Sequence, residues 1–188
     1  METSLKSIFL LVTIFPTITL AYPNGRVEVA CTTMLPNHGV DPQTDLAPYS
    51  LTFSSTNYTG KLAFLITLSK EAEQDFRGFL IQARAPGGNN ILGSFVVNGS
   101  DAQTLTCTTP NSAVSHTSRS AKSKIEVIWL PPSSSSDIQF RATVVQTRNV
   151  FWTNVLSDVL KAKSASQQTS ASILLLFLIC SSTLMHIL

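Results

Sequence analysis

The stretch Asp75-Phe76-Arg77-Gly78-Phe79-Leu80-Ile81-Gln82-Ala83-Arg84 decides the fold, because its aromatic and branched residues predict a central β-strand. From Phe79 onward, apolar residues alternate with polar ones at the period of a half-buried strand. The pattern ends at the breaker cluster Pro86-Gly87-Gly88. Because a glycine weakens a strand interior, Gly78 predicts a bulge or a close sheet contact beside it.

Composition limits the classes of protein that this chain can represent. It has 188 residues, 13 basic and 11 acidic side chains and a net charge of +2, which indicates one domain without a strong electrostatic bias. The basic residues are scattered, and the nearest approach to a cluster is Arg119, Lys122 and Lys124. A nucleic-acid partner is therefore not expected.

The N-terminal residues 1–21 have the layout of a secretory signal peptide. Lys6 precedes an apolar run, and small residues at positions 19 and 21 allow cleavage after Ala21. The alternative, a membrane anchor, needs a longer apolar span than these residues supply. We therefore expect the mature chain to begin at Tyr22.

The C-terminal residues 173–188 form a second apolar run. Its 16 residues would make a helix of about 24 Å, shorter than the roughly 30 Å hydrocarbon core, and no basic residue follows them. Small residues Ser164-Ala165-Ser166 begin a polar spacer, 164–172, ahead of the run. This layout favours a glycosylphosphatidylinositol (GPI) attachment signal with Ser164 as the candidate site, and the alternatives are a short transmembrane tail or a buried helix.

Residues 22–163 are enough for one filled core, and their patterns are almost wholly strand-like. Besides the central stretch, we expect strands at 26–31, 49–54, 61–68, 91–97, 104–108, 123–129, 138–145 and 150–152. Asn98-Gly99 predicts a hairpin turn. After the strand at 150–152, the apolar residues of 155–160 recur at helical spacing, so a short helix is an alternative there. Trp129 is expected in the core. The prediction is an all-β, antiparallel sandwich of two packed sheets.

The cysteines and the acceptor sequons fit an oxidising compartment. Cys180 lies in the tail, which leaves Cys31 and Cys107 as an even pair, and we expect a disulfide between them. A reactive thiol or a metal ligand is the alternative for this pair. The sequons that begin at Asn57 and Asn98 fall at expected turns and predict exposed N-glycosylation sites.

The sequence contains no motif that indicates catalysis, such as His-Glu-x-x-His, Gly-x-Ser-x-Gly or Cys-x-x-Cys, so no enzyme activity and no cofactor are expected. His38 and His116 are the histidines of the expected mature chain. They could meet and bind a metal with a carboxylate such as Asp41, although isolated histidines in loops are more often structural. We assign no metal, and we treat both histidines as binding candidates.

A family resemblance runs through most of the mature chain. It is carried, in this order, by Tyr22-Pro23-Asn24-Gly25-Arg26-Val27, Cys31, Met34, Pro36, His38-Gly39, Pro48-Tyr49, Phe76-Arg77-Gly78-Phe79-Leu80-Ile81-Gln82-Ala83-Arg84, Gly93-Ser94-Phe95, Thr106-Cys107, His116, Lys124, Trp129, Pro131-Pro132, Phe140-Arg141-Ala142-Thr143-Val144-Val145 and Phe151-Trp152. In this combination the chain resembles the reeler (reelin-type) domain. The resemblance implies an extracellular β-sandwich with a disulfide joining Cys31 and Cys107, and the chain lacks the cysteines for the second disulfide of some members.

The relatives suggest two functions from different classes. Ferric-chelate reductase-like members add a DOMON domain and a b-type cytochrome, and reelin and spondin-like members add adhesion modules. Single-domain insect defence proteins resemble this chain more in architecture. We therefore expect a non-enzymatic module, secreted or at the cell surface, that binds an extracellular ligand in innate immunity or adhesion and reaches the membrane through its tail. The alternative is a redox accessory domain in which His38 and His116 face a metal.

Since core positions are occupied by packing, we expect binding in loops. The segments 35–47 and 110–122 are expected to expose the most polar groups for binding, and each contains one of the two histidines. A bridge between Cys31 and Cys107 would bring the starts of these segments together. Because they are expected to be surface loops, replacing either histidine with alanine is predicted to change stability by no more than about 1 kcal/mol.

Overall fold

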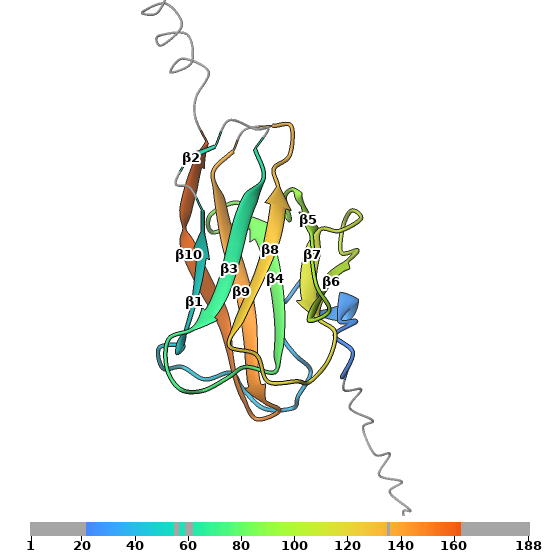
Figure 1. Ribbon diagram of the computed structural model, residues 1–188, viewed down its shortest axis with the longest axis vertical. Coiled ribbons are helices and arrows are strands. Elements are labelled where there is room, and N and C mark those ends of the chain that lie inside the picture. The colour runs from blue at the N-terminus through green and yellow to red at the C-terminus, as the bar shows by residue number, and fades with distance from the viewer. Residues whose placement is uncertain (1–21, 55–56, 59–61, 135, 163–188) are drawn as a thin grey trace, which may run out of the picture.

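The computed structural model describes residues 22–54, 57–58, 62–134 and 136–162, which form two packed β-sheets (Figure 1). The four-stranded sheet has the order β1-β3-β8-β5, and the six-stranded sheet has the order β2-β10-β9-β4-β7-β6. Their bounds are β1 Tyr49–Phe53, β2 Asn57–Tyr58, β3 Phe64–Lys70, β4 Gly78–Arg84, β5 Ser94–Val96, β6 Ala102–Leu105, β7 Ala113–His116, β8 Lys124–Leu130, β9 Ile138–Thr147 and β10 Val150–Ala162, with a 3₁₀ helix η1 at Glu28–Ala30. The predicted all-β sandwich is confirmed. One described pair, β2 with β10, is parallel.

The main core lies between the two sheets. Trp129 of β8 and Phe140 of β9 meet edge to face, with ring centroids 5.2 Å apart. Trp129 is fully buried, as predicted, and its indole nitrogen donates a hydrogen bond of 3.1 Å to the carbonyl oxygen of Leu92. Burial of each large apolar side chain contributes about 1.5–3 kcal/mol relative to exposure, so this layer is the principal source of stability.

Strand β4 is buried on both faces, which corrects the expectation of a half-buried strand. All seven of its residues are buried, including Gln82 and Arg84. Phe79, Ile81 and Ala83 belong to the main core, whereas the alternate residue Leu80 belongs to a second apolar cluster. The second face is covered because the N-terminal segment, residues 22–42, forms a third layer there.

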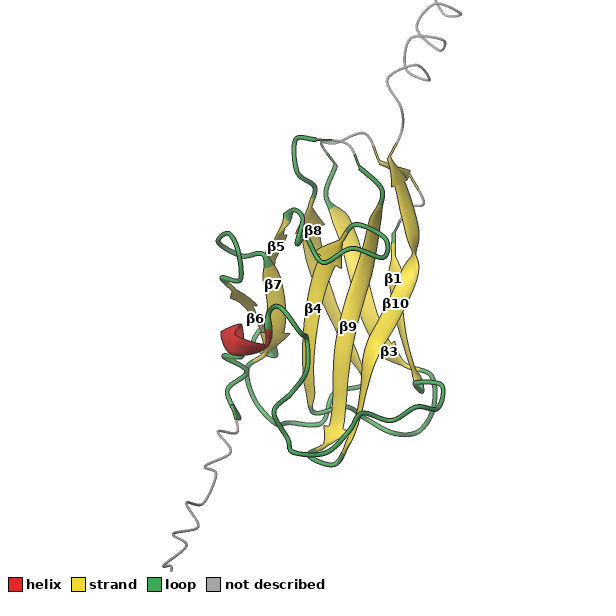
Figure 2. Cartoon of the chain, turned by 180° about the vertical axis from the view of Figure 1, so that it is seen from behind, coloured by secondary structure: helices red, strands yellow, loops and turns green. Residues whose placement is uncertain are grey.

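The strand predicted at 26–31 is wrong. The segment instead contains helix η1, which lies beside β6 and β7 on the outer side of the six-stranded sheet (Figure 2). Gly25 and Met34 have φ values of 69° and 57°, so the backbone turns on either side of the helix and cannot continue as an extended strand.

Two local expectations along the later chain are also wrong. The Asn98-Gly99 turn does not join a hairpin, because β5 pairs with β8 in one sheet and β6 pairs with β7 in the other. The helix considered for 155–160 is part of the long strand β10, whose register with β9 shifts at three places. These irregularities interrupt the simple two-residue alternation and produce the misleading spacing.

The segment 110–122, expected to be a loop, contains strand β7. Gly78 does make the expected close contact: a Cβ atom there would lie 3.2 Å from the His116 ring. The predictions for residues 1–21, 164–172 and 173–188, with Ser164 and Cys180, lie outside the described residues. Within the described ranges, no helix has the length and apolar character needed to cross a membrane.

Candidate functional site

The N-terminal segment is fixed to β4 by a disulfide and by buried side chains. Cys31 and Cys107 are bonded, with Cα atoms 5.6 Å apart, and this confirms the predicted bridge. Their separation of 76 residues corresponds to about 4 kcal/mol in the chain-entropy account of disulfide stabilisation. The carbonyl oxygen of Cys31 also accepts hydrogen bonds from Gln82 Nε2 at 3.0 Å and Arg84 Nη2 at 2.9 Å. These contacts explain why two polar side chains of β4 are buried.

A second, smaller apolar cluster lies under this segment. The hydroxyl of Thr143 donates a hydrogen bond of 2.5 Å to the carbonyl oxygen of Met34, which ties the segment to β9. The buried members of the cluster are Ala30, Met34, Leu80, Leu105 and Ala113. A cleft lies beside this cluster, along the N-terminal segment.

The cleft has a volume of about 930 Å³ and lies between the N-terminal segment and the ends of β4 and β9. Leu80 and Val145 line it from the sheet side, and Phe151 lines it from β10. Residues 33–42 supply the opposite wall. The size is within the range of about 300–1,000 Å³ that is usual for ligand sites.

Cationic side chains surround this cleft. Arg77, Arg119 and Arg148 all line it and are all exposed, whereas Asp41 is the one acid among the described residues that line it. The guanidinium of Arg77 donates a hydrogen bond of 3.2 Å to the backbone carbonyl oxygen of Arg119, so two of the arginines are linked. Within the described part of the chain, neither Arg77 nor Arg119 forms a salt bridge. The cleft therefore has an uncompensated positive charge.

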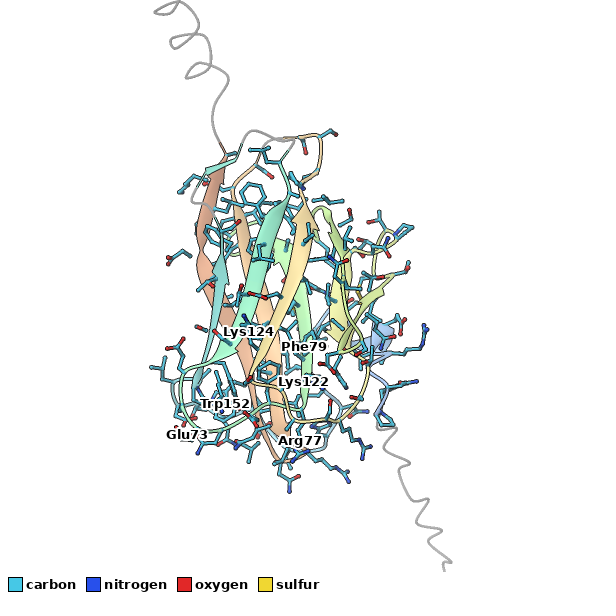
Figure 3. The ribbon with its side chains drawn as sticks, viewed as in Figure 1. Glu73, Arg77, Phe79, Lys122, Lys124 and Trp152 are labelled. Carbon is cyan, nitrogen blue, oxygen red and sulfur yellow. A yellow bond between two sulfur atoms is a disulfide. The ribbon has the colours of Figure 1, made fainter. Side chains whose placement is uncertain are left out.

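Lys122 holds the loop that carries Arg119. Its side chain is buried, and its Nζ donates hydrogen bonds to the carbonyl oxygens of Ser118 at 3.0 Å and Ser120 at 2.8 Å. Burial lowers the pKa of Lys122, opposed by the charge of Asp101. Figure 3 shows Lys122 and Arg77 at the same end of the sandwich. The lysine thus adds positive charge close to the cleft and positions the loop.

His116 lies on β7 rather than in a loop, which corrects the sequence prediction. Its Nδ1 accepts a hydrogen bond of 3.2 Å from the backbone N–H of Phe79, and its carbonyl oxygen accepts one of 2.7 Å from Gln103. Burial lowers the pKa of His116, and the charges of Lys122 and Arg119 lower it further. His116 is therefore a structural part of the cleft wall, and its replacement is not the neutral surface change that the sequence suggested.

His38 reaches the same cleft from the N-terminal segment. Its ring contacts Phe151 edge to face, with centroids 5.5 Å apart. Burial lowers the pKa of His38, opposed by a hydrogen bond to the backbone of Arg148. The structure therefore brings the two candidate histidines to one cleft, as hypothesised. No cluster of three or more metal-ligating side chains occurs among the residues described.

The predicted glycosylation sites are separate from this cleft. Asn98 follows β5 and is exposed, and Asn57 begins β2. Their modification stays a prediction. The three arginines of the cleft were not singled out from the sequence, because 77, 119 and 148 are far apart in the chain and only the fold brings them together.

Comparison with known proteins shows which family has this architecture. The sequence profile of the Reeler domain matches residues 29–168. The chain belongs to the Reeler domain family. The crystal structure of the Reelin-N domain of F-spondin superposes with a TM-score of 0.58, covering 74% of this chain and 100% of that domain at 18% identity, which supports the shared fold.

Two groups of relatives are similar in sequence. "Putative defense protein" of Bombyx mori is 34% identical over 151 residues, covering 77% of this chain and 87% of that protein, and "Putative defense protein 1" of Antheraea mylitta is 33% identical over 154 residues, covering 78% and 90%. "Ferric-chelate reductase 1" of Mus musculus is 38% identical over 157 residues, covering 80% of this chain. The chain spans about a quarter, 26%, of that reductase.

Proposed function

We propose that this reeler protein is a secreted or cell-surface binding module of innate defence, without enzyme activity, that holds its ligand in the cleft beside the N-terminal segment. The observation that carries the proposal is the convergence of Arg77, Arg119, Arg148, His38 and His116 on one cleft of ligand size. The insect defence proteins support the biological setting, because the similarity spans nearly their full length. The likeness to F-spondin concerns the fold and does not favour adhesion.

The proposal is tested by binding of the secreted protein to whole cells. Protein from a eukaryotic host that expresses the full chain is incubated with bacterial, fungal and host cells, and the bound fraction is measured after sedimentation. Arg119→Gln should reduce binding, since Arg119 is exposed in the cleft. Arg26→Gln removes the same charge from an exposed residue outside the cleft and is the control. Equal binding by both variants would place recognition elsewhere.

The reductase relatives favour a second candidate, a metal-facing accessory domain. In it His38 and His116 would contact the metal, but His116 Nδ1 already accepts a hydrogen bond from the backbone N–H of Phe79. The absorption spectrum of the purified protein after incubation with ferric iron or haem separates the candidates. A saturable band that is lost in His38→Ala would support the redox role, and an unchanged spectrum would count against it.

Attachment to the cell surface is part of the proposal. The small residues at 164–166 and the apolar run at 173–188 support a GPI signal. Phosphatidylinositol-specific phospholipase C should release the protein from cells. Protein that stays bound, and that detergent extracts with residues 173–188 still present, would instead contain a transmembrane tail.

A further inference from the structure

The outer wall of the cleft exposes apolar side chains that the fold does not use. Val29, Leu35 and Val40 are 76%, 47% and 44% exposed, and all three line the cleft. On the other side of the cleft lie Phe151 and Val145, of which Val145 is only half-buried. Apolar surface on two sides of a cleft is suited to a hydrocarbon chain, because burial of each methylene group contributes about 0.8 kcal/mol.

The charged side chains beside this apolar surface are mainly cationic: among the described residues that line the cleft there are three arginines and one acid, Asp41. Arg77 and Arg119 are joined through a hydrogen bond to a backbone carbonyl group, and within the described ranges neither pairs with a carboxylate. Lys122 adds a third cation behind them. Guanidinium groups bind carboxylates through two parallel hydrogen bonds, so the unpaired arginines complement an anionic head group.

From these two features together we infer that the cleft binds a long-chain carboxylate, with its hydrocarbon chain between the N-terminal segment and the sheet and its head group at Arg77 and Arg119. The volume of about 930 Å³ accommodates such a ligand. The inference rests on the proposed function, because it names the ligand class of the same cleft. A sulfated oligosaccharide would satisfy the arginines but leave the apolar walls exposed to water.

The test compares two amphiphiles with chains of equal length and heads of opposite charge. Palmitate and hexadecyltrimethylammonium are titrated into the secreted protein below their micelle concentrations, with isothermal titration calorimetry as the readout. Palmitate should bind in a one-to-one complex and at least about tenfold more tightly than the cationic amphiphile, a difference of about 1.4 kcal/mol.

Matched variants distinguish the contribution of the carboxylate head group to binding from that of the hydrocarbon chain. Arg119→Gln should weaken palmitate about tenfold and leave the cationic amphiphile unchanged, whereas Arg26→Gln should change neither. Leu35→Gln should weaken palmitate about fivefold. Its control is Leu156→Gln, since Leu156 on β10 is 46% exposed, close to the 47% of Leu35, but does not line the cleft.

Three results would overturn the inference. Equal affinity for the two amphiphiles would show adsorption without head-group recognition. Palmitate binding that is insensitive to both Arg119→Gln and Leu35→Gln would place the ligand elsewhere. A lack of palmitate binding, with cell binding still lost in Arg119→Gln, would reject the ligand class but keep the cleft as the recognition site, so failure of this inference is distinguishable from failure of the proposed function. In that last case, titration with a sulfated oligosaccharide that is insensitive to Leu35→Gln would identify a purely polar ligand.

Discussion

At Gly25 the N-terminal segment lies in close contact with the six-stranded sheet. A Cβ atom on Gly25 would lie 1.7 Å from the carbonyl oxygen of His116 and 2.7 Å from its carbonyl carbon. Both are backbone atoms of β7, so the strand cannot relieve the overlap by rotating a side chain. In Gly25→Ala the N-terminal segment must therefore withdraw from the sheet.

Gly25→Ala should lower the free energy of unfolding for two reasons. The φ of 69° places Gly25 in the left-handed region, where alanine costs about 1 kcal/mol or more. Withdrawal also breaks the hydrogen bond that Gln103 Nε2 donates to the carbonyl oxygen of Asn24, whereas its bond to His116 lies within the sheet and is kept. One hydrogen bond contributes about 1 kcal/mol, so the total loss in the free energy of unfolding is about 2 kcal/mol.

Gly39 offers a matched control. Its φ is 77°, and a Cβ atom there would meet nothing within 4 Å. Gly39→Ala should therefore lower the free energy of unfolding only by the cost of the left-handed backbone conformation, about 1 kcal/mol. Equilibrium urea denaturation with the disulfide intact measures both variants, and the difference of about 1 kcal/mol reports the close approach. Equal losses for the two variants would refute the described packing of the N-terminal segment.

Three further predictions follow from other contacts. Arg84→Met should lower the free energy of unfolding by about 3 kcal/mol, because Arg84 is 2% exposed and two acceptors, Gln82 Oε1 and the Cys31 carbonyl oxygen, each lose a donor. Urea denaturation beside the exposed control Arg26→Met measures the loss, and equal losses for the two variants would contradict the prediction. Stability should fall as pH drops below about 6.5, because burial holds the pKa of His116 below the ordinary value for histidine, so the unfolded chain takes up the proton first. The loss of stability should be smaller in His116→Asn, and denaturation at pH values of about 7 and 5 measures it. Peptide N-glycosidase should increase the gel mobility of the secreted protein, and the increase should be smaller for the Asn98→Gln variant. No change in mobility for either protein would mean that the exposed sequon is unused.

Strands with one face toward the core could be predicted from local patterns. In β8, Ile125, Val127 and Trp129 are buried between exposed or half-buried neighbours, so alternation in the sequence matches alternation in burial. The pattern failed for β4 because Leu80, Gln82 and Arg84 face a third layer rather than water. It failed for β10 because its shifts in register with β9 change which residues share a face.

Of the residues in the candidate site, only the two histidines could be predicted from the sequence as binding residues. His38 and His116 were identified because the mature chain has few residues of that type, and the disulfide hypothesis brought their segments together. The arginines carried no such signal. Arg77 and Arg119 are 42 positions apart, and they meet because β4 and β7 are neighbouring strands.

By itself, the sequence determined the fold class, the pairing of Cys31 with Cys107 and the resemblance to a family, because these depend on local periodicity, on a small number of cysteines and on residue order. Only the tertiary structure decided where the N-terminal segment lies and which charges surround the cleft that it forms. The physical reason is that residues 22–42 pair with no strand: they are positioned by a disulfide, by hydrogen bonds from Arg84 and Thr143, and by the close approach of Gly25 to β7, all of which involve partners distant in the chain.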